Sequence, residues 1–564
     1  MARSNALVVQ FLRQYASVLA LNGESRFKVK AYRRAADTVD SLDRDVATLV
    51  ADGVDLTTLP GVGDAIASVI AEILRTNGLA ALQKFSARLS PELAELATRP
   101  ALDARKVQRI YKKLGIGKLI ELRSALDDGR IRSAFDSRME FHVRQGLSDG
   151  PRMLLWQADK IARSIEAFLT AIPGVRSVSV VGSVRRRLET VGDLNLLVAG
   201  SRAGTIFNRF EEFGGATLTE RPEARRATFQ LSAGTRVTLD WTPLNLWAQA
   251  LIDATGSPAH LAKLRQLAKR RPRAGARPRA KSSAAPANDE GSVYRHLELQ
   301  FIPPELREDQ GEVEAAAAGH LPQLVQLSDI RGDLHMHTTA SDGANSIEEM
   351  AEAARERGYS YIAITDHSQS LKITNGLSEE RLLKHIAAID RVNARLKGFT
   401  VLKSAEVDIL EDGQLDYSDR VLKRLDFTIC SIHSRFGLDR NAQTERILRA
   451  MDNPYFTILG HATGRLLLRR EGYEIDFERI VRHAKQNGCY FEINSNPNRL
   501  DLSHEHARCA KEAGIKITIN TDAHSTQEMA FMTAGINQAR RAWLEPSDVL
   551  NTLSLPALRR QMQR

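Results

Sequence analysis

The sequence predicts a multidomain protein with a helical N-terminal region, an α+β middle domain and a C-terminal distorted seven-stranded α/β barrel. Its 564 residues exceed what one hydrophobic core supports. Apolar residues recur at helical spacing over residues 1–150, whereas short apolar runs alternate with helical segments from residue 329 onward. The hydrophobic fraction of 43% is ordinary for a globular protein, so these regions can form cores of their own.

We expect six segments, whose boundaries follow changes in composition and periodicity. They are a helical domain at 1–95, a second helical domain at 96–150, an α+β domain at 151–268, a linker at 269–291, a connector at 292–328 and the barrel at 329–564. The first 13 residues of the linker contain seven Lys or Arg and no acid. A segment of this composition cannot bury a core, so it is either an inert tether or a nonspecific contact for DNA phosphates.

The overall charge points to a polyanionic partner. The formal net charge is +10 and the pI is about 9.5, which favours nucleic acid. Cys430, Cys489 and Cys509 are too few and too scattered for a disulfide framework and fit a reducing cytoplasm. No apolar run reaches membrane-spanning length, and the N-terminus lacks the apolar core of a signal peptide. We therefore expect a cytoplasmic, nucleoid-associated protein with no membrane partner.

The N-terminal region contains a candidate phosphate-binding turn. The run LPGVGDAIASVIAEIL (59–74) predicts a helix, a Gly-Val-Gly turn and a second helix. Gly61 and Gly63 would let backbone N–H groups approach a DNA phosphate closely, although a plain turn between two helices is the simpler alternative. A second copy at 97–116 has a basic helix but carries Ala101 and Asp103 where glycines are expected, so we interpret it as degenerate.

The middle domain has the sequence pattern of a small sheet with flanking helices. Short β-rich runs at 177–182, 193–200, 227–234 and 236–241 predict an antiparallel or mixed sheet. Asp193 and Asn195 stand two apart on one strand and share a face, offering one carboxylate and one amide. The preceding Gly-Ser turn is followed by three arginines (185–187), which are either a phosphate contact or a solvated basic turn.

Nearly every strand of the predicted barrel ends in a side chain that can bind a metal. The runs are GDLHMH, YSYIAITDH, FTVLKSAEVD, DFTICSIH, YFTILGHA, CYFEINS and IKITINTDAH. Because the carboxyl ends of the strands in such a barrel form one rim, residues far apart in the chain should converge there. The candidate ligands are His335, His337, Asp342, His367, Glu406, His433, His461, Asp522 and His524.

This ligand set predicts a multinuclear centre for phosphoester hydrolysis. Imidazole and carboxylate together suit Mn²⁺, Zn²⁺ or Fe, and nine ligands could hold two or three ions. Such a centre clamps a phosphate and activates water. A lone histidine is more often structural, but six of the 14 histidines end successive strands here. We expect the other eight at the surface: His142, His260, His296, His320, His385, His483, His504 and His506.

Residues 329 to about 550 resemble the PHP (polymerase and histidinol phosphatase) family, whose motif clusters are all present. The resemblance implies that all nine candidate residues are metal ligands, with His335 and Asp522 in the catalytic machinery. Family members are metal-dependent phosphoesterases that act on small phosphate esters or on DNA ends. The resemblance therefore agrees with the chemistry expected from the residues alone.

The order of motifs along the whole chain resembles a bacterial family X DNA polymerase fused to a C-terminal PHP domain. A helix-hairpin-helix region and a fingers-like domain precede a nucleotidyltransferase-like palm, and the runs FIPPELRE (301–308) and GHATGRLLLRR (460–470) are typical of the fused family. The resemblance implies a DNA partner, bound mostly through its phosphates.

Within that resemblance the palm residues take family roles. Gly182 and Ser183 match the turn that receives the nucleotide triphosphate, and Arg186 matches an arginine that contacts it. Asp193 and Asp240 match two of the three carboxylates that hold two Mg²⁺ or Mn²⁺ ions for phosphoryl transfer.

The sequence departs from the family pattern at four places in the front half. Asn195 replaces a carboxylate that bridges both metals, and an amide carries no charge to hold them. Asp253 and Ala254 stand where the family carries Tyr-Phe before Thr-Gly-Ser, and Val69 stands at the lysine of lyase-type relatives. The basic linker takes the place of a structured thumb. We therefore expect a degenerate polymerase site and doubt lyase activity.

These features favour a DNA-repair protein whose PHP domain is a 3′-5′ exonuclease or 3′-end-processing phosphoesterase. The polymerase-like half would bind gapped or 3′-ended DNA, with polymerase activity weak or lost. The alternatives are a bifunctional gap-filling polymerase and exonuclease, and a non-catalytic DNA-binding repair scaffold. A further variant has the PHP site hydrolyse a small phosphate ester.

Overall fold

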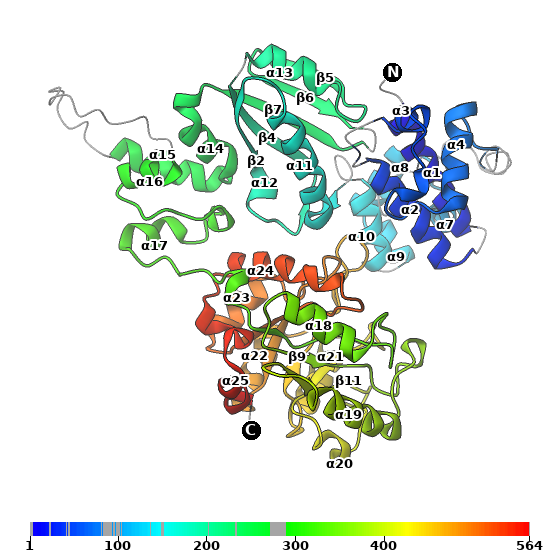
Figure 1. Cartoon of the computed structure of the whole chain (residues 1–564), viewed down its shortest axis with the longest axis vertical. Coiled ribbons are helices and arrows are strands. Elements are labelled where there is room, and N and C mark those ends of the chain that lie inside the picture. Colours follow the sequence, from blue (N-terminus) through cyan, green and yellow to red (C-terminus); the bar gives the residue numbers. More distant parts are fainter. Residues whose placement is uncertain are drawn as a thin grey trace. The chain divides into compact units, whose positions relative to one another are not determined.

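The computed structural model describes residues 4–80, 104–147, 152–270 and 289–562. Short gaps remain at 22–23, 41, 43–44, 136, 201 and 232–233, and Leu82, Leu93, Leu96 and Leu102 are described singly. The chain divides into two compact units: Met1–Gly319 with Leu468–Arg470, and His320–Leu467 with Glu471–Arg564 (Figure 1). No helix among the described residues is long and apolar enough to cross a membrane.

The N-terminal helices pack around a core of their own. They are α1 (Ser4–Leu21), α2 (Arg26–Asp40), α3 (Val46–Ala51) and α4 (Asp64–Thr76), with a 3₁₀ turn at Leu56–Thr58. The predicted Gly-Val-Gly turn joins that 3₁₀ turn to α4. Gly61 has φ +77°, a conformation that favours glycine, whereas Gly63 is extended and caps α4. Of the two glycines, only Gly61 is required by backbone conformation.

A second helical group follows and has a separate core. It consists of α7 (Ala104–Leu114), α8 (Leu119–Asp127), α9 (Arg130–Ala134) and α10 (Ser137–Gly146). Val107, Ile110, Leu122 and Val143 are among the buried side chains that hold these helices together. The basic helix of the predicted second hairpin is α7, while residues 97–101 and 103 of that motif lie outside the described residues.

The middle domain contains a five-stranded mixed sheet in the order β2-β4-β7-β6-β5 (Figure 1), and four of these strands correspond to the four predicted β-rich runs. The strands are β2 (Val175–Val181), β4 (Asp193–Gly200), β5 (Thr217–Glu223), β6 (Arg226–Gln230) and β7 (Arg236–Thr242), with a small ladder of β1 (Met153–Leu154) and β3 (Thr190–Val191). The helices are α11 (Leu155–Thr170), α12 (Gly182–Arg185) and α13 (Ala203–Phe210). Sequence periodicity missed β5, because this edge strand is exposed along its whole length and lacks alternation.

Helices continue on both sides of the predicted linker. They are α14 (Trp247–Thr255), α15 (Pro258–Arg270), α16 (Glu290–His296) and α17 (Glu312–Ala318). The central part of the linker, residues 271–288, lies outside the described residues.

The second unit contains the predicted ring of parallel strands. They are β8 (Gly332–Asp333), β9 (Tyr361–Ile364), β10 (Thr400–Lys403), β11 (Glu406–Asp408), β12 (Ile429–Ser431), β13 (Ile458–Leu459), β14 (Tyr490–Asn494) and β15 (Ile517–Asn520). They form two sheets, β10-β9-β8 and β11-β12-β13-β14-β15. Parallel bridges between Met336 and Ala523 and between His367 and Glu406 join the sheets at both seams. The run predicted as the third strand breaks after Lys403, which gives eight short strands and the distortion of the barrel.

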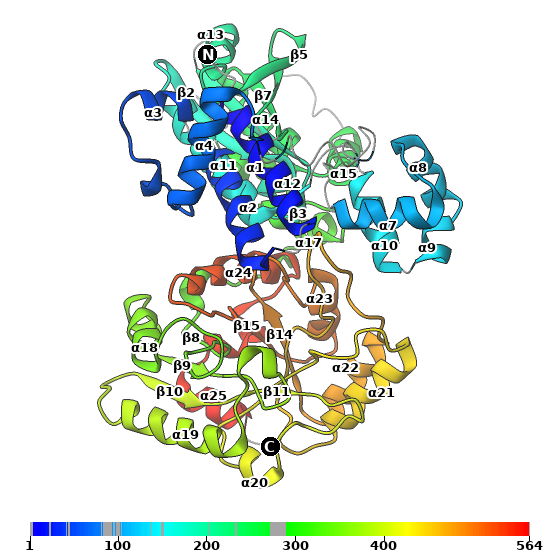
Figure 2. The same cartoon turned by 90° about the vertical axis from the view of Figure 1, so that its right-hand side faces the viewer.

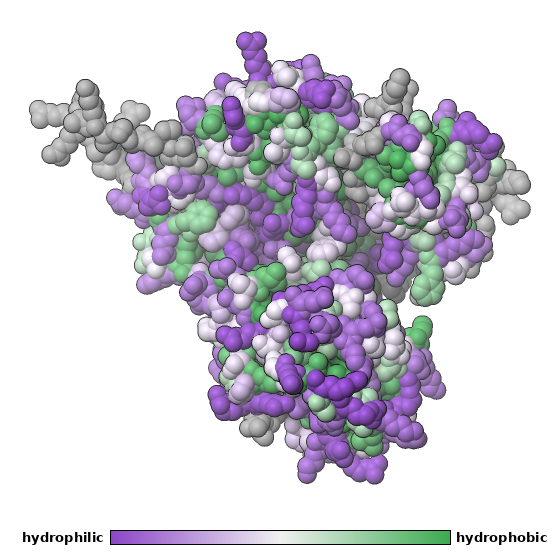
Figure 3. Space-filling model, viewed as in Figure 1, coloured by the Kyte–Doolittle hydropathy of each residue, from purple (hydrophilic) through white to green (hydrophobic). Residues whose placement is uncertain are grey.

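Helices surround this ring (Figure 2). They are α18 (Ile347–Glu356), α19 (Glu379–Asn393), α20 (Asp419–Leu422), α21 (Arg440–Met451), α22 (Phe477–Gln486), α23 (His504–Glu512), α24 (Met532–Arg541) and α25 (Leu555–Met562). Ser346, Ser378 and Asp439 cap three of them by accepting a backbone N–H in the first turn. In the view of Figure 3 the molecular surface is mostly hydrophilic, with scattered hydrophobic residues.

The expectation that the eight remaining histidines lie at the surface is wrong for three of them. His296 and His320 are exposed, and His483, His504 and His506 are half-buried. His142, His260 and His385 are buried. His260 shows the physical reason: its Nδ1 lies 2.6 Å from Glu312 and its Nε2 lies 3.1 Å from the Tyr294 hydroxyl. Partners that are distant in sequence satisfy the ring, and helical periodicity cannot reveal them.

Candidate metal centre

The ends of the barrel strands bring the predicted ligands to one place. His335 and His337 follow β8 and share a face, while Met336 between them is fully buried in the core. His367 follows β9, and Glu406 opens β11. His433, His461, Asp522 and His524 follow β12, β13 and β15, so each ligand comes from a strand terminus or from the loop beyond it.

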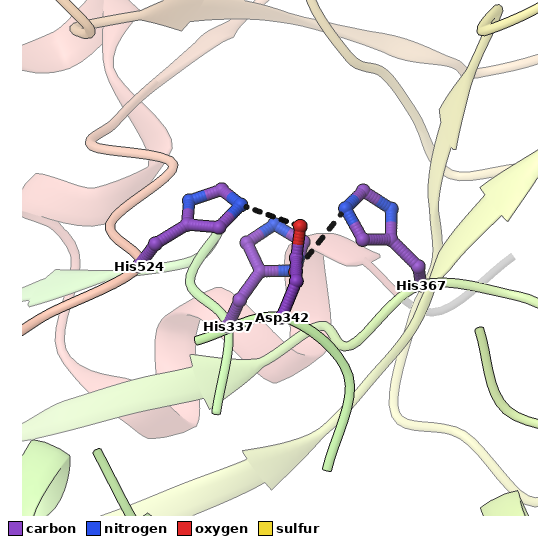
Figure 4. A group of neighbouring side chains, drawn as sticks. All are labelled: His337, Asp342, His367 and His524. Carbon is purple, nitrogen blue, oxygen red and sulfur yellow. Dashed lines mark ion pairs between the residues drawn. The ribbon is translucent and has the colours of Figure 1, made fainter. Parts of the chain in front are cut away.

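One group gathers around Asp342, on the loop after β8. Its Oδ1 lies 3.6 Å from His367 Nε2 and 3.9 Å from His337 Nδ1, and its Oδ2 lies 3.4 Å from His524 Nε2. Figure 4 shows the carboxylate between the rings of His367 and His524. The ligand atoms of these four residues lie within 4.8 Å of one another, close enough to hold one metal ion.

Two further groups adjoin the first and share members with it. His335, His337 and Asp522 form one, in which Asp522 Oδ1 lies 3.6 Å from His335 Nε2 and 3.1 Å from His337 Nε2. His367, Glu406 and His433 form the other, with 2.8 Å from Glu406 Oε2 to His367 Nδ1 and 3.3 Å from Oε1 to His433 Nε2.

His461 joins through Glu406, whose Oε1 lies 2.8 Å from its Nε2. All nine predicted residues therefore belong to one connected cluster.

Six of the nine side chains are buried, while His433 and His524 are half-buried and Asp342 is exposed. Burial alone would raise the pKa of Glu406, but His433, His367 and His335 hold that pKa well below its ordinary value. Burial lowers the pKa of His367, but Glu406 and Asp342 outweigh burial and raise it to about 10. Carboxylates thus draw positive charge into a water-poor site, and a divalent cation would take the place of those protons.

The hydrogen bonds around the centre fit metal binding. His335 Nδ1 lies 2.7 Å from Glu492 Oε1, His433 Nδ1 lies 2.7 Å from Asp408 Oδ1, and His524 Nδ1 lies 2.9 Å from the Asp522 carbonyl. Each contact fixes one ring nitrogen and turns Nε2 toward the centre, as outer partners of metal-bound histidines do. His335 Nε2 and His337 Nδ1 are buried and have no hydrogen-bond partner among the described residues. Divalent cations would satisfy both atoms.

Sequence reasoning missed two acids that support the ligands. Glu492 lies within β14 and Asp408 at the end of β11, and both are buried. Their signal was present, because a carboxylate inside an otherwise apolar strand has to find a partner. Which partner it finds depends on the neighbouring strands, and the linear sequence does not give that.

Asp366, a third carboxylate whose role sequence reasoning missed, supports the loop that carries Asp342. Asp366 accepts hydrogen bonds from the backbone N–H of Thr338 at 2.9 Å and from the hydroxyl groups of Thr338 and Ser341. His385, expected to be a surface residue, lies with its Nε2 2.9 Å from Asp366 Oδ2. Burial raises the pKa of Asp366, but His385 outweighs burial and lowers it to about 2, so this carboxylate stays charged.

Arg499 is the fourth feature that the sequence did not reveal. It lies on the loop after β14, with its Nε 3.7 Å from Asp522 Oδ2 and its side chain 22% exposed. Asn494 Nδ2 donates to the same carboxylate oxygen at 3.0 Å. A guanidinium at the edge of a metal cluster is suited to hold a phosphate oxygen.

Asp193 and Asp240 lie on the adjacent strands β4 and β7, and each forms an ion pair with an arginine. In the parallel pairing of β4 and β7, Asn195 lies opposite Thr238 and Asp240 opposite Leu197. Arg226 of β6 holds Asp240 through two contacts, Nε–Oδ1 at 2.6 Å and Nη2–Oδ2 at 2.9 Å. Asp193 lies 4.0 Å from Arg236. A metal site here requires the bidentate arginine to release Asp240.

The turn that is predicted to receive the triphosphate is formed, but the side chain of Arg186 already makes hydrogen bonds within the protein. Gly182 has φ +63°, and a side chain there would approach the Asn195 amide at 3.4 Å. Ser183 follows in the short helix α12. Arg186 Nε donates to Glu308 at 2.9 Å and its Nη1 to the Thr255 carbonyl at 2.7 Å. A nucleotide would have to compete with these contacts.

Comparisons with known families agree with this architecture. A helix-hairpin-helix domain matches residues 3–79, a DNA polymerase beta thumb matches residues 250–308, and a PHP domain matches residues 333–496. The class of protein is therefore a polymerase-β-like DNA-handling half joined to a PHP half.

Relatives identify the family. The chain is 35% identical over 560 residues to the "DNA polymerase/3'-5' exonuclease PolX" of Bacillus subtilis (strain 168), covering 97% of both proteins. It therefore belongs to the bacterial PolX family. Its C-terminal part is 30% identical over 233 residues to a "Probable phosphatase" of Thermoanaerobacter sp. (strain X514), which covers 39% of this chain and 89% of the relative.

One expectation about the front half is wrong. The basic linker does not replace the thumb, because the thumb match runs from residue 250 to residue 308 and includes the linker. Helices α14, α15 and α16 lie on both sides of residues 271–288 within that match. The linker is thus a basic segment within a retained thumb, and Asn195, Asp253-Ala254 and Val69 are the departures that the resemblance still leads us to expect.

Proposed function

We propose that the PHP half is a metal-dependent phosphoesterase that removes nucleotides from the 3′ end of DNA. The observation that carries the proposal is the connected cluster of nine ligand-type side chains, in which outer hydrogen bonds orient His335, His433 and His524. Two or three divalent ions, Mn²⁺ or Zn²⁺ or Fe, would occupy it. Bound ions would supply activation of water and neutralisation of phosphate charge.

The chain's own residues have separate roles in this proposal. His337, Asp342, His367 and His524 would hold one ion. Asp522 with His335, and Glu406 with His433 and His461, would hold the others. Arg499 would orient a phosphate oxygen beside Asp522. Burial of His335, His337, His367, Glu406, His461 and Asp522 keeps competing water from these six side chains, which would strengthen their electrostatic interactions with the phosphate.

DNA is the proposed substrate class. The helix-hairpin-helix and thumb matches, the net charge of +10 and the exonuclease named for the Bacillus subtilis relative support this choice. The protein would bind gapped or 3′-ended DNA, mostly through its phosphates, and would hydrolyse it at the nucleoid. We propose weak or absent polymerase activity, because Asn195 replaces a carboxylate and Arg226 engages Asp240. Any residual activity would use nucleotides with Mg²⁺ or Mn²⁺ at Asp193 and Asp240.

One incubation tests the proposal against its alternatives. Gapped DNA labelled on the primer strand is incubated with Mn²⁺ and nucleotides, using wild type, His335→Ala, Asp240→Ala and the exposed control His320→Ala. We expect shortening in wild type, Asp240→Ala and His320→Ala, and none in His335→Ala. Extension that requires Asp240 would support a bifunctional enzyme instead. Tight DNA binding without turnover in wild type would support a scaffold. Hydrolysis of a small ester alone would support the phosphatase variant suggested by the Thermoanaerobacter relative.

A further inference from the structure

The loop that follows β9 begins at the candidate metal centre. It runs from residue 368 to residue 377 and begins immediately after the ligand-type residue His367. The Leu377 N–H donates to the His367 carbonyl at 2.8 Å, which brings the two ends of the loop together. Residues 369–376 therefore project from the rim where the substrate phosphate has to arrive.

Contacts on both sides hold this loop in place. Asn375 Nδ2 donates at 3.2 Å to the carbonyl of Ala340, which lies two residues before Asp342. Arg381 links the same two loops, because it donates to the Ala340 carbonyl at 2.7 Å and to the Asn375 carbonyl at 2.9 Å. On the other side, the Ser370 N–H donates to Asp416 Oδ2 at 2.6 Å. The loop is thus fixed to the segments after β8 and β11.

The tip of this anchored loop presents an apolar side chain to solvent. Lys372–Thr374 form a single 3₁₀ turn. Ile373 is 89% exposed, the highest value among the exposed large hydrophobic side chains of the described residues. Lys372 beside it is exposed as well. A fixed loop that holds an aliphatic side chain away from every core, next to a cation, is suited to a ligand with an apolar face and a phosphate.

We propose that this loop separates the 3′ end of double-stranded DNA, with Ile373 packing against the terminal base pair and Lys372 binding a neighbouring phosphate. Aliphatic side chains inserted at a base step unstack it, as in many proteins that deform DNA. A phosphate in a stacked, paired end cannot reach the six buried side chains of the cluster, so the last nucleotide has to leave the stack first. The inference rests on the proposed exonuclease function and specifies how that site receives its substrate.

The test compares paired and single-stranded 3′ ends in the full-length protein with Mn²⁺. Ile373→Ser lowers kcat/KM about 10-fold on a blunt duplex end and less than about 2-fold on a single-stranded end; tenfold corresponds to about 1.4 kcal/mol. Ile373→Leu restores the duplex rate. Hydrolysis of bis(p-nitrophenyl) phosphate, which contains no base pair, reports whether the metal centre itself is intact.

Two control variants separate the possible explanations. Leu327→Ser changes an exposed hydrophobic residue of the same unit that precedes β8, at the opposite ends of the strands, and leaves both DNA rates unchanged. Lys372→Gln lowers both DNA rates by the same factor and reduces their salt dependence, because both ends carry phosphates.

The possible failures are distinguishable. If wild type shortens DNA and Ile373→Ser shortens the duplex end equally fast, the separating role of the loop is wrong while the exonuclease proposal stands. If wild type hydrolyses only the small ester, the exonuclease proposal is wrong and this inference is overturned with it.

Discussion

Replacing Glu492 by Gln should weaken metal binding although the residue is not proposed as a ligand. The carboxylate is fully buried, and four nitrogen atoms lie within hydrogen-bonding distance of its two oxygens. Its Oε1 lies 2.7 Å from His335 Nδ1 and 2.9 Å from Asn520 Nδ2. Its Oε2 accepts from the His461 N–H at 2.9 Å and from Asn494 Nδ2 at 3.3 Å.

The magnitude follows from that arrangement. Glutamine has the same shape but only one accepting oxygen, so its NH₂ group must face either His335 and Asn520 or His461 and Asn494. Loss of an outer partner typically costs 10–100-fold in metal affinity or activity, or about 1.4–2.7 kcal/mol. The buried donors left without an acceptor add a loss in the free energy of unfolding of about 1–3 kcal/mol.

A Mn²⁺ titration checks this prediction. Hydrolysis of bis(p-nitrophenyl) phosphate is followed against Mn²⁺ concentration, and metal affinity is measured separately by calorimetry. Glu478→Gln, an exposed substitution on α22 of the same unit, serves as the control and should match wild type. A Glu492→Gln protein with wild-type Mn²⁺ affinity and turnover would refute the claim that Glu492 orients His335.

Three further outcomes follow from the same geometry. Arg499→Ala should lower kcat/KM for DNA about 10–100-fold, the value of one charge-assisted hydrogen bond, while Mn²⁺ affinity stays within about 2-fold; equal DNA cleavage would show that Arg499 does not touch the phosphate. Removing metal with a chelator should lower Tm. Adding Mn²⁺ back at 100 times its Kd should recover about 2.7 kcal/mol of the free energy of unfolding. A Tm that does not change with metal would argue against a metal centre in the cluster. Asn195→Asp should raise primer extension on gapped DNA with Mn²⁺, since the thumb is retained; no gain would mean that Arg226 or the Asp253-Ala254 change is decisive.

Much of the fold could be predicted because its signals are local. Alternating apolar strands and helices predicted the barrel, and four β-rich runs predicted the mixed sheet of the middle domain. The break after Lys403 was not predictable, because it depends on β10 pairing with β9 while β11 pairs with β12. The edge strand β5 was missed for a related reason: its stability comes from pairing with β6 and not from its own pattern.

The clustering of the ligand-type side chains was predictable because strand ends of a parallel barrel share one rim. His335 and His524 could be predicted to lie close together without knowledge of any distance. The supporting residues were not predictable, since Glu492 supports His335 across 157 positions and Asp408 supports His433 across 25. Buried polar partners of this kind are specified by packing, and composition within a short window does not encode them.

The expectation of a lost thumb failed for a compositional reason. The arginine- and proline-rich residues 271–288 have no core-forming pattern, and they hid the helical residues that surround them. An insertion within a domain and the replacement of that domain look alike when only the inserted segment is considered.

The most direct test of the central claim is the rate of nucleotide release from a labelled 3′ end in Asp522→Asn compared with Asp240→Ala, in Mn²⁺. We predict that Asp522→Asn loses at least about 100-fold, because it removes a buried ligand charge from the cluster, while Asp240→Ala keeps the wild-type rate. Release that survives in Asp522→Asn and disappears in Asp240→Ala would contradict the account and assign the chemistry to the palm.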